Sequence, residues 1–120
     1  MKKIIVTGAC GFIGSHLVEY LYEQNYDIIA FVRYNPNKDI GWLKNSKIRD
    51  KIDIRLGDIR DFDSVSKNFR DAKICLHLAA LIGIPYSYVS PAAYLKTNIE
   101  GTYNVLETCK ELKYKQIIVT

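Results

Sequence analysis

The feature that most constrains the fold is a glycine-rich loop between a short apolar run and an amphipathic run. Residues 3–7 are centred on the apolar, strand-forming residues Ile4, Ile5 and Val6, and they lead into the sequence Thr-Gly-Ala-Cys-Gly-Phe-Ile-Gly at residues 7–14. Residues 12–23 then follow a helical pattern, with an expected buried face of Ile13, Leu17, Tyr20 and Leu21. Glycine permits a sharp turn from a strand into a helix and lets the helix pack close to a sheet. The loop therefore predicts a β-α unit at the start of the chain.

Apolar runs and amphipathic runs continue to alternate along the rest of the chain. We expect further strands at residues 27–33, 52–56, 73–78 and 116–120. We expect helices at residues 40–43, 61–69 and 90–112, with Asp61 and the hydroxyl of Ser90 as N-caps. Continuous apolar strands that alternate with helices are typical of an α/β fold with a parallel sheet covered on both faces. With right-handed crossovers, this pattern predicts a Rossmann doubly wound parallel sheet with strand order 3-2-1-4-5.

The domain organisation follows from the length and the order of the strands. The 120 residues fit a single domain, residues 1–120, and no repeat, linker or low-complexity segment divides it. In the predicted order the last strand lies at an edge of the sheet, where residues 117–119 would present unpaired backbone groups. We therefore expect that more chain follows Thr120 and that this sequence is the N-terminal part of a domain, truncated at its fifth strand.

Composition argues against several classes of protein. The net charge is +4, and the lysines are scattered rather than grouped with aromatic residues, which does not favour a nucleic-acid partner. No apolar run approaches the roughly 20 residues that cross a bilayer, so we expect no membrane segment. The three cysteines, Cys10, Cys75 and Cys109, lack metal-ligand spacing. They predict reduced thiols in a cytoplasmic protein without a metal site.

The glycine loop also predicts a ligand. It contains no charged side chain, so an anion bound there would contact free backbone amides and the positive end of the following helix. Gly8, Gly11 and Gly14, placed between a strand and a helix, indicate the pyrophosphate of a dinucleotide. The alternative is a tight turn that binds nothing, but no simple turn type requires three glycines at this spacing.

The ends of the second and third predicted strands bear on the choice of dinucleotide. An acidic residue after the second strand would bind the ribose 2′-hydroxyl of NAD, whereas an arginine favours the 2′-phosphate of NADP. The sequence has Arg33 and no carboxylate there, which favours NADP over NAD; the alternatives are a solvated arginine, or Asn35 as the partner of a free ribose. Asp58, at the end of the third strand, either accepts from the adenine amino group or bonds its own backbone in a turn.

Four ordered motifs cover nearly the whole chain. They are Thr7-Gly8-x-x-Gly11-Phe12-Ile13-Gly14-Ser15-His16-Leu17, Gly57-Asp58-Ile59-Arg60-Asp61, His77-Leu78-Ala79-Ala80 and Thr97-Asn98-Ile99-Glu100-Gly101-Thr102. Together they resemble the extended short-chain dehydrogenase/reductase family of NAD-dependent epimerases and dehydratases. Within it, residues 31–35, 41–43 and 81–88 look most like nucleotide-sugar 4,6-dehydratases of the legionaminic-acid type.

The resemblance implies cofactor-binding roles beyond the three glycines. Phe12 and Ile13 would donate their amides to the pyrophosphate. Asp58 and Ile59 would hold the adenine, and Ala79 and Ala80 would line the cofactor cleft with small side chains. Residues 84–88 would face the nicotinamide and the hexose.

Four further residues of the motifs need an explanation. Asn98 matches a family residue near the active site, and the alternative is a solvated asparagine in the middle of a helix. Gly101 costs a helix about 1 kcal/mol relative to alanine, and a close packing contact would explain it. His16 and His77 lack a partner pattern for metal binding or nucleophilic catalysis, so we expect both to be structural.

The family's catalytic residues are expected outside this chain. A Ser or Thr follows the fifth strand in the family and a Tyr-x-x-x-Lys pair lies on the next helix, whereas this sequence ends at Thr120 and holds no substitute. The resemblance therefore implies the NAD(P)-binding portion of a sugar-nucleotide 4,6-dehydratase that acts by transient oxidation at C4, inactive as this chain alone. A 4-epimerase and a non-catalytic NADP-binding module are the alternatives. The implied partners are a nucleotide sugar and, in the full-length protein, a second subunit of a homodimer that uses the helix at residues 91–112.

Overall fold

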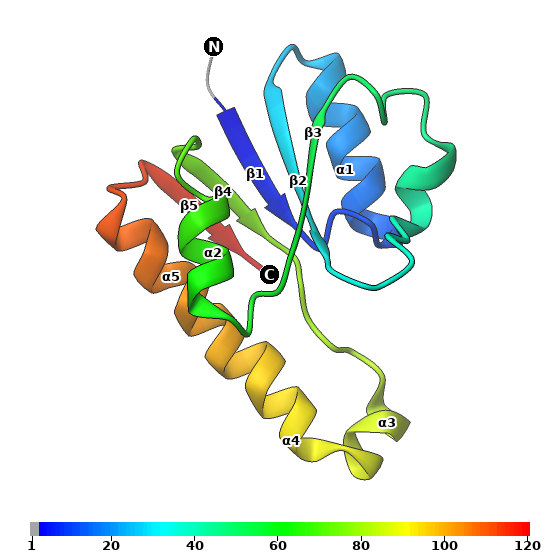
Figure 1. The fold of residues 1–120 in the computed structure, drawn as a ribbon, viewed down its shortest axis with the longest axis vertical. Helices are drawn as coiled ribbons and strands as arrows, with labels where there is room; N and C mark the ends of the chain where they lie inside the picture. The colour runs from blue at the N-terminus through cyan, green and yellow to red at the C-terminus, as the bar shows by residue number, and fades with distance from the viewer. Residues whose placement is uncertain (1–2) are drawn as a thin grey trace.

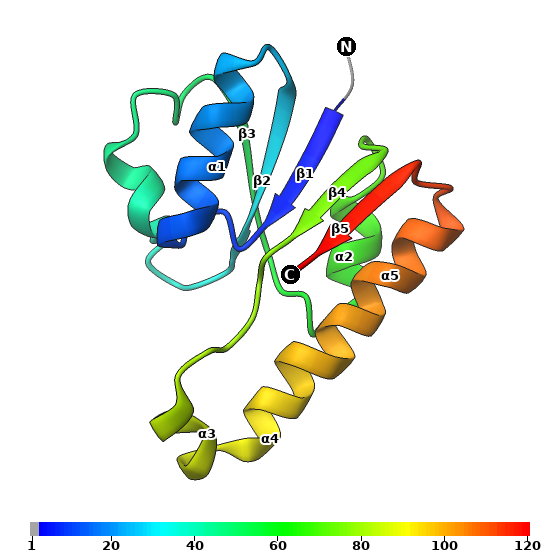
Figure 2. The same ribbon diagram turned by 180° about the vertical axis from the view of Figure 1, so that it is seen from behind.

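The computed structural model describes residues 3–120 as a five-stranded parallel sheet with helices on both faces (Figure 1). The strands are β1 (Lys3–Thr7), β2 (Asp27–Arg33), β3 (Asp53–Gly57), β4 (Ile74–His77) and β5 (Gln116–Val119). They lie in the order β3-β2-β1-β4-β5, and every neighbouring pair is parallel. All five strands therefore end at the same edge of the sheet (Figure 2). The predicted Rossmann sheet and its strand order are confirmed.

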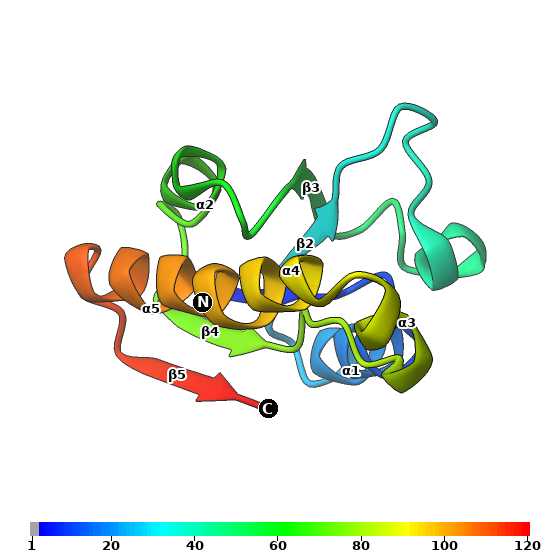
Figure 3. The same cartoon turned by 90° about the horizontal axis from the view of Figure 1, so that it is seen from below.

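Helices cover the two faces of the sheet in separate groups (Figure 3). α1 (Phe12–Glu23) and the 3-10 helix η1 (Gly41–Asn45) lie on one face. α2 (Phe62–Asn68) and α5 (Gly101–Glu111) lie on the other. Two short helices, α3 (Ile84–Val89) and α4 (Pro91–Tyr94), lie beyond the carboxyl edge of the sheet (Figure 1).

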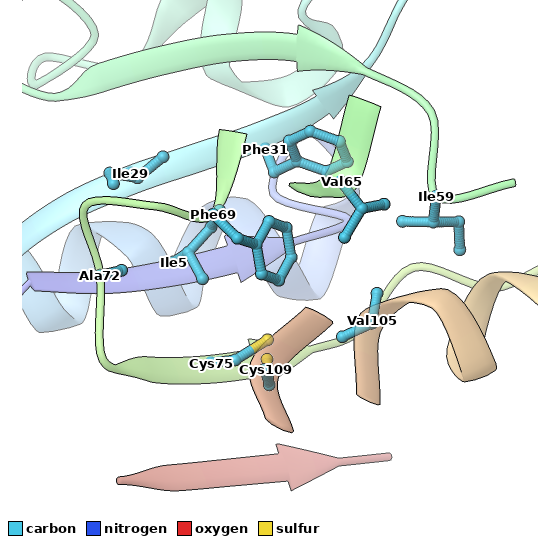
Figure 4. Packing of buried hydrophobic residues seen from close by; sticks show 10 residues of the cluster. All are labelled: Ile5, Ile29, Phe31, Ile59, Val65, Phe69, Ala72, Cys75, Val105 and Cys109. Carbon is cyan, nitrogen blue, oxygen red and sulfur yellow. The ribbon is translucent and has the colours of Figure 1, made fainter. Parts of the chain in front are cut away.

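Alternate residues of the strands contribute to two separate cores. The core under α2 and α5 holds ten buried residues (Figure 4): Ile5, Ile29, Phe31, Ile59, Val65, Phe69, Ala72, Cys75, Val105 and Cys109. The core under α1 holds nine: Ile4, Val6, Ala9, Val18, Leu21, Ile28, Ala30, Val32 and Leu43. Because both faces of the sheet are buried, the inner strands carry apolar side chains at consecutive positions rather than in alternation.

The buried face of α1 differs from the one predicted. Ile13 and Tyr20 were expected inside, but they are 70% and 59% exposed. The residues that face the sheet are Gly14, Ser15, Val18 and Leu21. Two small side chains at the start of the helix allow its first turn to approach the glycine loop closely, and this contact sets the rotation of the whole helix. Hydrophobicity alone favoured the larger side chains and therefore predicted the wrong rotation.

The helix predicted at residues 90–112 is present as one continuous rod of three parts. α4 is followed by a π-helical turn, η2 (Leu95–Glu100), and then by α5. The predicted cap is wrong, because the Ser90 side chain makes no capping hydrogen bond. Ser90 instead ends α3, and its backbone N–H donates to the carbonyl of Tyr86 at 2.9 Å. No helix within residues 3–120 is both long and apolar enough to span a membrane.

The predicted cap of α2 is confirmed, and it supports a test of helix stability. The Asp61 carboxylate accepts a hydrogen bond from the backbone N–H of Asp63 at 3.0 Å. We expect Asp61→Ala to lower the free energy of unfolding by about 1 kcal/mol, since the first turn of α2 loses this acceptor. Asp61→Asn, which keeps an acceptor, should stay close to the original value. Urea unfolding would measure both, and equal losses in the two variants would contradict the capping role.

Candidate cofactor-binding site

The carboxyl edge of the sheet holds a cavity of about 680 Å³. Its walls come from the glycine loop after β1, from the ends of β2 and β3, and from the segment after β4. Ten of the eleven predicted cofactor-binding residues line it: Gly8, Gly11, Phe12, Ile13, Gly14, Arg33, Asp58, Ile59, Ala79 and Ala80. In open α/β sheets, ligands bind at this edge. The structure therefore brings together residues that lie far apart in the sequence.

The three glycines of the loop differ in how strongly their surroundings exclude a side chain. Gly8 has a φ of +67°, and a Cβ there would lie 2.9 Å from the backbone nitrogen of Ala79. A Cβ on Gly14 would lie 2.1 Å from the carbonyl oxygen of Gly8. A Cβ on Gly11 would come no closer than 3.4 Å to that same oxygen, which is an ordinary contact. Packing within the domain thus explains Gly8 and Gly14, whereas Gly11 has no such explanation and borders the cavity.

The first turn of α1 is suited to an anion. Gly11 is its N-cap residue and provides no side-chain cap, and the first turn contains no acidic residue. The backbone amides of the first turn of a helix lack partners within that helix, and the helix dipole makes this end positive. Phe12 and Ile13 belong to this turn and line the cavity. A phosphate group at this place would receive hydrogen bonds without any cationic side chain.

A buried chain of hydrogen bonds fixes the start of the loop against β4. The Thr7 hydroxyl accepts from the backbone N–H groups of Leu78 and Ala79, both at 3.0 Å, and lies 2.7 Å from Nδ1 of His77. Two donors already occupy this hydroxyl, so its own proton is donated to Nδ1. Nε2 of His77 then carries the ring proton and donates to the Thr102 hydroxyl at 3.1 Å. Burial lowers the pKa of His77 to about 4, which keeps the ring neutral and agrees with a structural role.

Asp58 shows the local bonding that the sequence left open. Its carboxylate accepts from the backbone N–H of Arg60 at 2.9 Å and from the Arg60 guanidinium at 2.7 Å. These hydrogen bonds lower the pKa of Asp58, so the carboxylate is charged at neutral pH. The turn interpretation of Asp58 is therefore correct. Its side chain also lines the cavity, where contact with adenine stays a prediction.

The two candidates at the end of β2 are placed differently. Arg33 is exposed and lines the cavity. The Asn35 side chain exchanges two hydrogen bonds with the backbone of Asp39, at 2.8 and 2.9 Å, and Asn35 is absent from the cavity wall. Of the two, only Arg33 is positioned to meet a group in the cavity.

Asn98 is the predicted site residue that does not line the cavity. Its amide donates to the carbonyl of Leu81 at 2.9 Å, and its oxygen accepts from the N–H of Leu81 at 2.8 Å. The alternative of a solvated asparagine is therefore wrong. Leu81 lines the cavity, so Asn98 positions one cavity wall through its hydrogen bonds to the Leu81 backbone. A direct contact between Asn98 and the cofactor stays a prediction.

The same long helix positions Ile59. A Cβ on Gly101 would lie 2.7 Å from Cδ1 of Ile59, so the close packing contact predicted at Gly101 is confirmed. One turn further on, the Asn104 side chain donates to the carbonyl of Ile59 at 2.9 Å. Sequence reasoning missed Asn104 and Thr102. Both lie on the buried side of the helix with Gly101, and polar residues next to a helical glycine are the signal that could have found them.

The remaining candidates for a functional role are the three cysteines and any group of side chains that could bind a metal ion. Cys10 lines the cavity, whereas Cys75 and Cys109 lie side by side in the core between β4 and α5 (Figure 4). All three are free thiols in the structure. Within residues 3–120, no group of three His, Cys, Asp or Glu side chains could hold a metal ion.

Fold and site together define a class of Rossmann-fold proteins in which a glycine loop and a helix N-terminus face a cavity at the carboxyl edge of the sheet. Comparisons with known proteins agree. The family model described as GDP-mannose 4,6 dehydratase matches residues 5–119. A putative UDP-glucose 4-epimerase of Methanocaldococcus jannaschii is 38% identical over 116 residues, which are 96% of this chain and 36% of the relative. The chain belongs to the extended short-chain dehydrogenase/reductase family, among the NAD-dependent epimerases and dehydratases.

Solved structures show the same relationship. The UDP-glucose 4-epimerase of Thermotoga maritima, solved with UDP-glucose, is 31% identical with a TM-score of 0.83, over 98% of this chain and 37% of that one. The UDP-glucose 4-epimerase of Thermus thermophilus, solved with NAD, is 27% identical with a TM-score of 0.82, over 96% of this chain and 36% of that one. The chain thus spans about a third of the length of these relatives.

Proposed function

We propose that this chain is the NAD(P)-binding portion of a sugar-nucleotide 4,6-dehydratase. The observation that carries the proposal is the convergence of the glycine loop, the first turn of α1 and the ends of β2, β3 and β4 on one cavity. Support also comes from the matched dehydratase family model and from relatives solved with NAD and with a UDP-sugar. When bound, the nicotinamide would accept a hydride from C4 of the hexose and return it later, with loss of water across C5 and C6 in between.

In this proposal the chain binds the dinucleotide and orients it. The amides of Phe12 and Ile13 receive the pyrophosphate at the positive end of α1. Asp58 and Ile59 border the adenine side of the cavity, where Asn104 and Gly101 hold Ile59 in place. Ala79 and Ala80 leave space for a flat ring at the end of β4 because their side chains are small. The expected acid/base residues of the family are not among these residues.

A 4-epimerase is the second candidate, and the identity to a putative UDP-glucose 4-epimerase favours it. Both reactions begin with the same oxidation at C4, so the cofactor site does not separate them. Incubation of the protein that carries this chain with nucleotide hexoses, followed by proton NMR, distinguishes the two. A 4-keto-6-deoxy sugar indicates a dehydratase, and inversion at C4 indicates an epimerase. Failure to bind NAD or NADP would contradict both.

Arg33 supports a preference for NADP over NAD, because it is the cation at the end of β2 that lines the cavity and no acidic residue stands there. We expect Arg33→Ala to weaken NADP binding about tenfold through loss of a charge-assisted hydrogen bond, while NAD binding changes little. Isothermal titration calorimetry with both dinucleotides would measure the ratio of their dissociation constants in the original protein and in the variant. Equal weakening of the two, or tighter binding of NAD by the original protein, would contradict the preference.

We also propose that the full-length protein is a homodimer. Leu95, Ile99, Tyr103 and Leu106 are between 42% and 62% exposed along the outer side of η2 and α5. A row of exposed apolar side chains on one helix is typical of a surface that another subunit covers. Light scattering of the full-length protein would determine its oligomeric state.

A further inference from the structure

The connection between β2 and the end of η1, residues 34–45, is held in a fixed shape by its own hydrogen bonds. Asn35 and Asp39 exchange two hydrogen bonds, and the Asp39 carboxylate accepts from the N–H of Gly41 at 2.8 Å. Leu43 is completely buried in the core under α1 and anchors the far end. The connection therefore has a defined position beside the glycine loop.

Gly41 and Trp42 bring this connection into contact with the loop. The backbone N–H of Trp42 donates to the carbonyl of Cys10 at 2.9 Å. Gly41 has a φ of +55°, and a Cβ there would lie 2.7 Å from the same carbonyl oxygen. The Trp42 ring meets the Phe12 ring edge to face, with centroids 5.0 Å apart. The contacts thus reach the residues on both sides of Gly11.

The backbone contacts fix one peptide plane. The carbonyl of Cys10 and the N–H of Gly11 belong to the same planar peptide group. Trp42 holds the carbonyl end, and the carbonyl of Gly8 accepts from the N–H end at 3.1 Å. A peptide group held at both ends cannot rotate, so the chain enters α1 in one direction. Phe12 and Ile13, which form the start of α1, border the cavity. Hydrophobic burial does not explain the aromatic contact, because Phe12 and Trp42 remain 58% and 59% exposed.

We propose that Gly41 and Trp42 are positioning residues for the pyrophosphate loop, which they hold from outside the cavity through the carbonyl of Cys10 and the ring of Phe12. This inference rests on the proposed function, since it assumes that the loop receives a diphosphate. It assigns a role in ligand binding to a connection whose residues 41 and 42 do not line the cavity. The connection also begins directly after Arg33, so one segment links the ribose end of the site to the diphosphate end.

The test compares a ligand that has a diphosphate with one that lacks it. In Gly41→Ala, ADP-ribose should bind about tenfold more weakly, because a new Cβ displaces the connection from Cys10 and misaligns the loop amides. Adenosine, which does not reach the loop, should change by less than about twofold. Trp42→Ala should show the same split with a smaller loss, and Lys44→Ala, an exposed residue of η1, is the matched control. NMR titrations would measure all affinities.

A second measurement does not depend on any ligand. If the connection positions the loop, the backbone order parameters of Gly11 and Phe12 should fall in Gly41→Ala, while those of later turns of α1 remain unchanged. Equal losses for ADP-ribose and adenosine, or unchanged affinity together with unchanged order parameters, would overturn the inference. If the original protein binds neither ligand, the proposed function fails, and the order parameters alone decide whether Gly41 and Trp42 position the loop.

Discussion

Gly14→Ala is expected to lower the free energy of unfolding by about 3 kcal/mol and to abolish dinucleotide binding. The new Cβ would lie 2.1 Å from the carbonyl oxygen of Gly8 and 2.9 Å from its carbonyl carbon. Both atoms are backbone, so relief requires α1 to move away from the loop or the loop to open. Alanine is the better helix former by about 1 kcal/mol, but this gain is smaller than the cost of the overlap. Urea unfolding and calorimetric titration with NAD and NADP would measure the two effects.

Gly11→Ala is the matched comparison, because it adds the same methyl group three residues earlier. The nearest atom to its Cβ is 3.4 Å away, and its φ of −75° suits alanine. Stability should therefore stay within about 1 kcal/mol of the original protein, while dinucleotide binding weakens because the methyl group borders the cavity. The two variants separate the glycine needed by the fold from the glycine needed by the ligand. Similar stability of both variants would contradict this division.

Acidification from pH 6.5 to pH 4 is expected to destabilise the domain by about 3 kcal/mol through His77 alone. Burial lowers the pKa of His77 from its ordinary 6.5 to about 4, because the imidazolium would lose hydration without gaining a carboxylate partner. Between these two values the unfolded chain binds a proton at this residue and the folded chain does not. Stability is therefore full above pH 6.5 and falls as the pH decreases toward 4. Protonation of Nδ1 would also remove the acceptor of the Thr7 hydroxyl.

Urea unfolding at several pH values would measure this loss, with His77→Gln as the test variant. The variant should be less stable at pH 7 but should lose little further stability down to pH 4. His16→Gln keeps His77 and should retain the acid-dependent loss. Hydrogen bonds from Arg60 and Arg55 lower the pKa of Asp58 and of Asp71 below their ordinary 3.8, so these two carboxylates lose most of their contribution below that pH. An unchanged pH profile in His77→Gln would contradict the assignment.

The features that could be predicted from the sequence are those set by neighbouring residues. Most of the strands contain short runs of apolar residues, and the glycine loop and the Asp61 cap are local patterns, so the sheet order and ten of the cavity residues were accessible. The rotation of α1 was not, because it depends on how close Gly14 comes to Gly8. Pairwise contacts across the fold, such as Asn98 with Leu81 and Asn104 with Ile59, were not accessible either, because nothing near either asparagine in the sequence identifies its partner.

Two structural elements escaped prediction for related reasons. α3 has only six residues and none of them is buried, so no amphipathic pattern marks it. The π-helical turn η2 contains Asn98, and it is a departure from regular geometry that residue preferences do not encode. η2 contributes Thr97 to the cavity wall, and α3 begins two residues after Ile82, another wall residue. Contacts across the fold, rather than local preferences, decide the backbone there.

The long helix has a consequence for how such a protein can diverge. Asn98 bonds the backbone of Leu81, the Tyr94 hydroxyl donates to the carbonyl of Gly83, and Asn104 donates to the carbonyl of Ile59. One long helix therefore holds the segments that follow β3 and β4. Residues 84–90 connect Gly83 to α4 and carry exposed apolar side chains such as Tyr88 and Val89. None of these three hydrogen bonds involves residues 84–90, so we expect insertions, deletions and substitutions there to leave the held segments in place. Residues 84–88, which we predict to face the hexose, can therefore change while the walls of the cavity keep their shape.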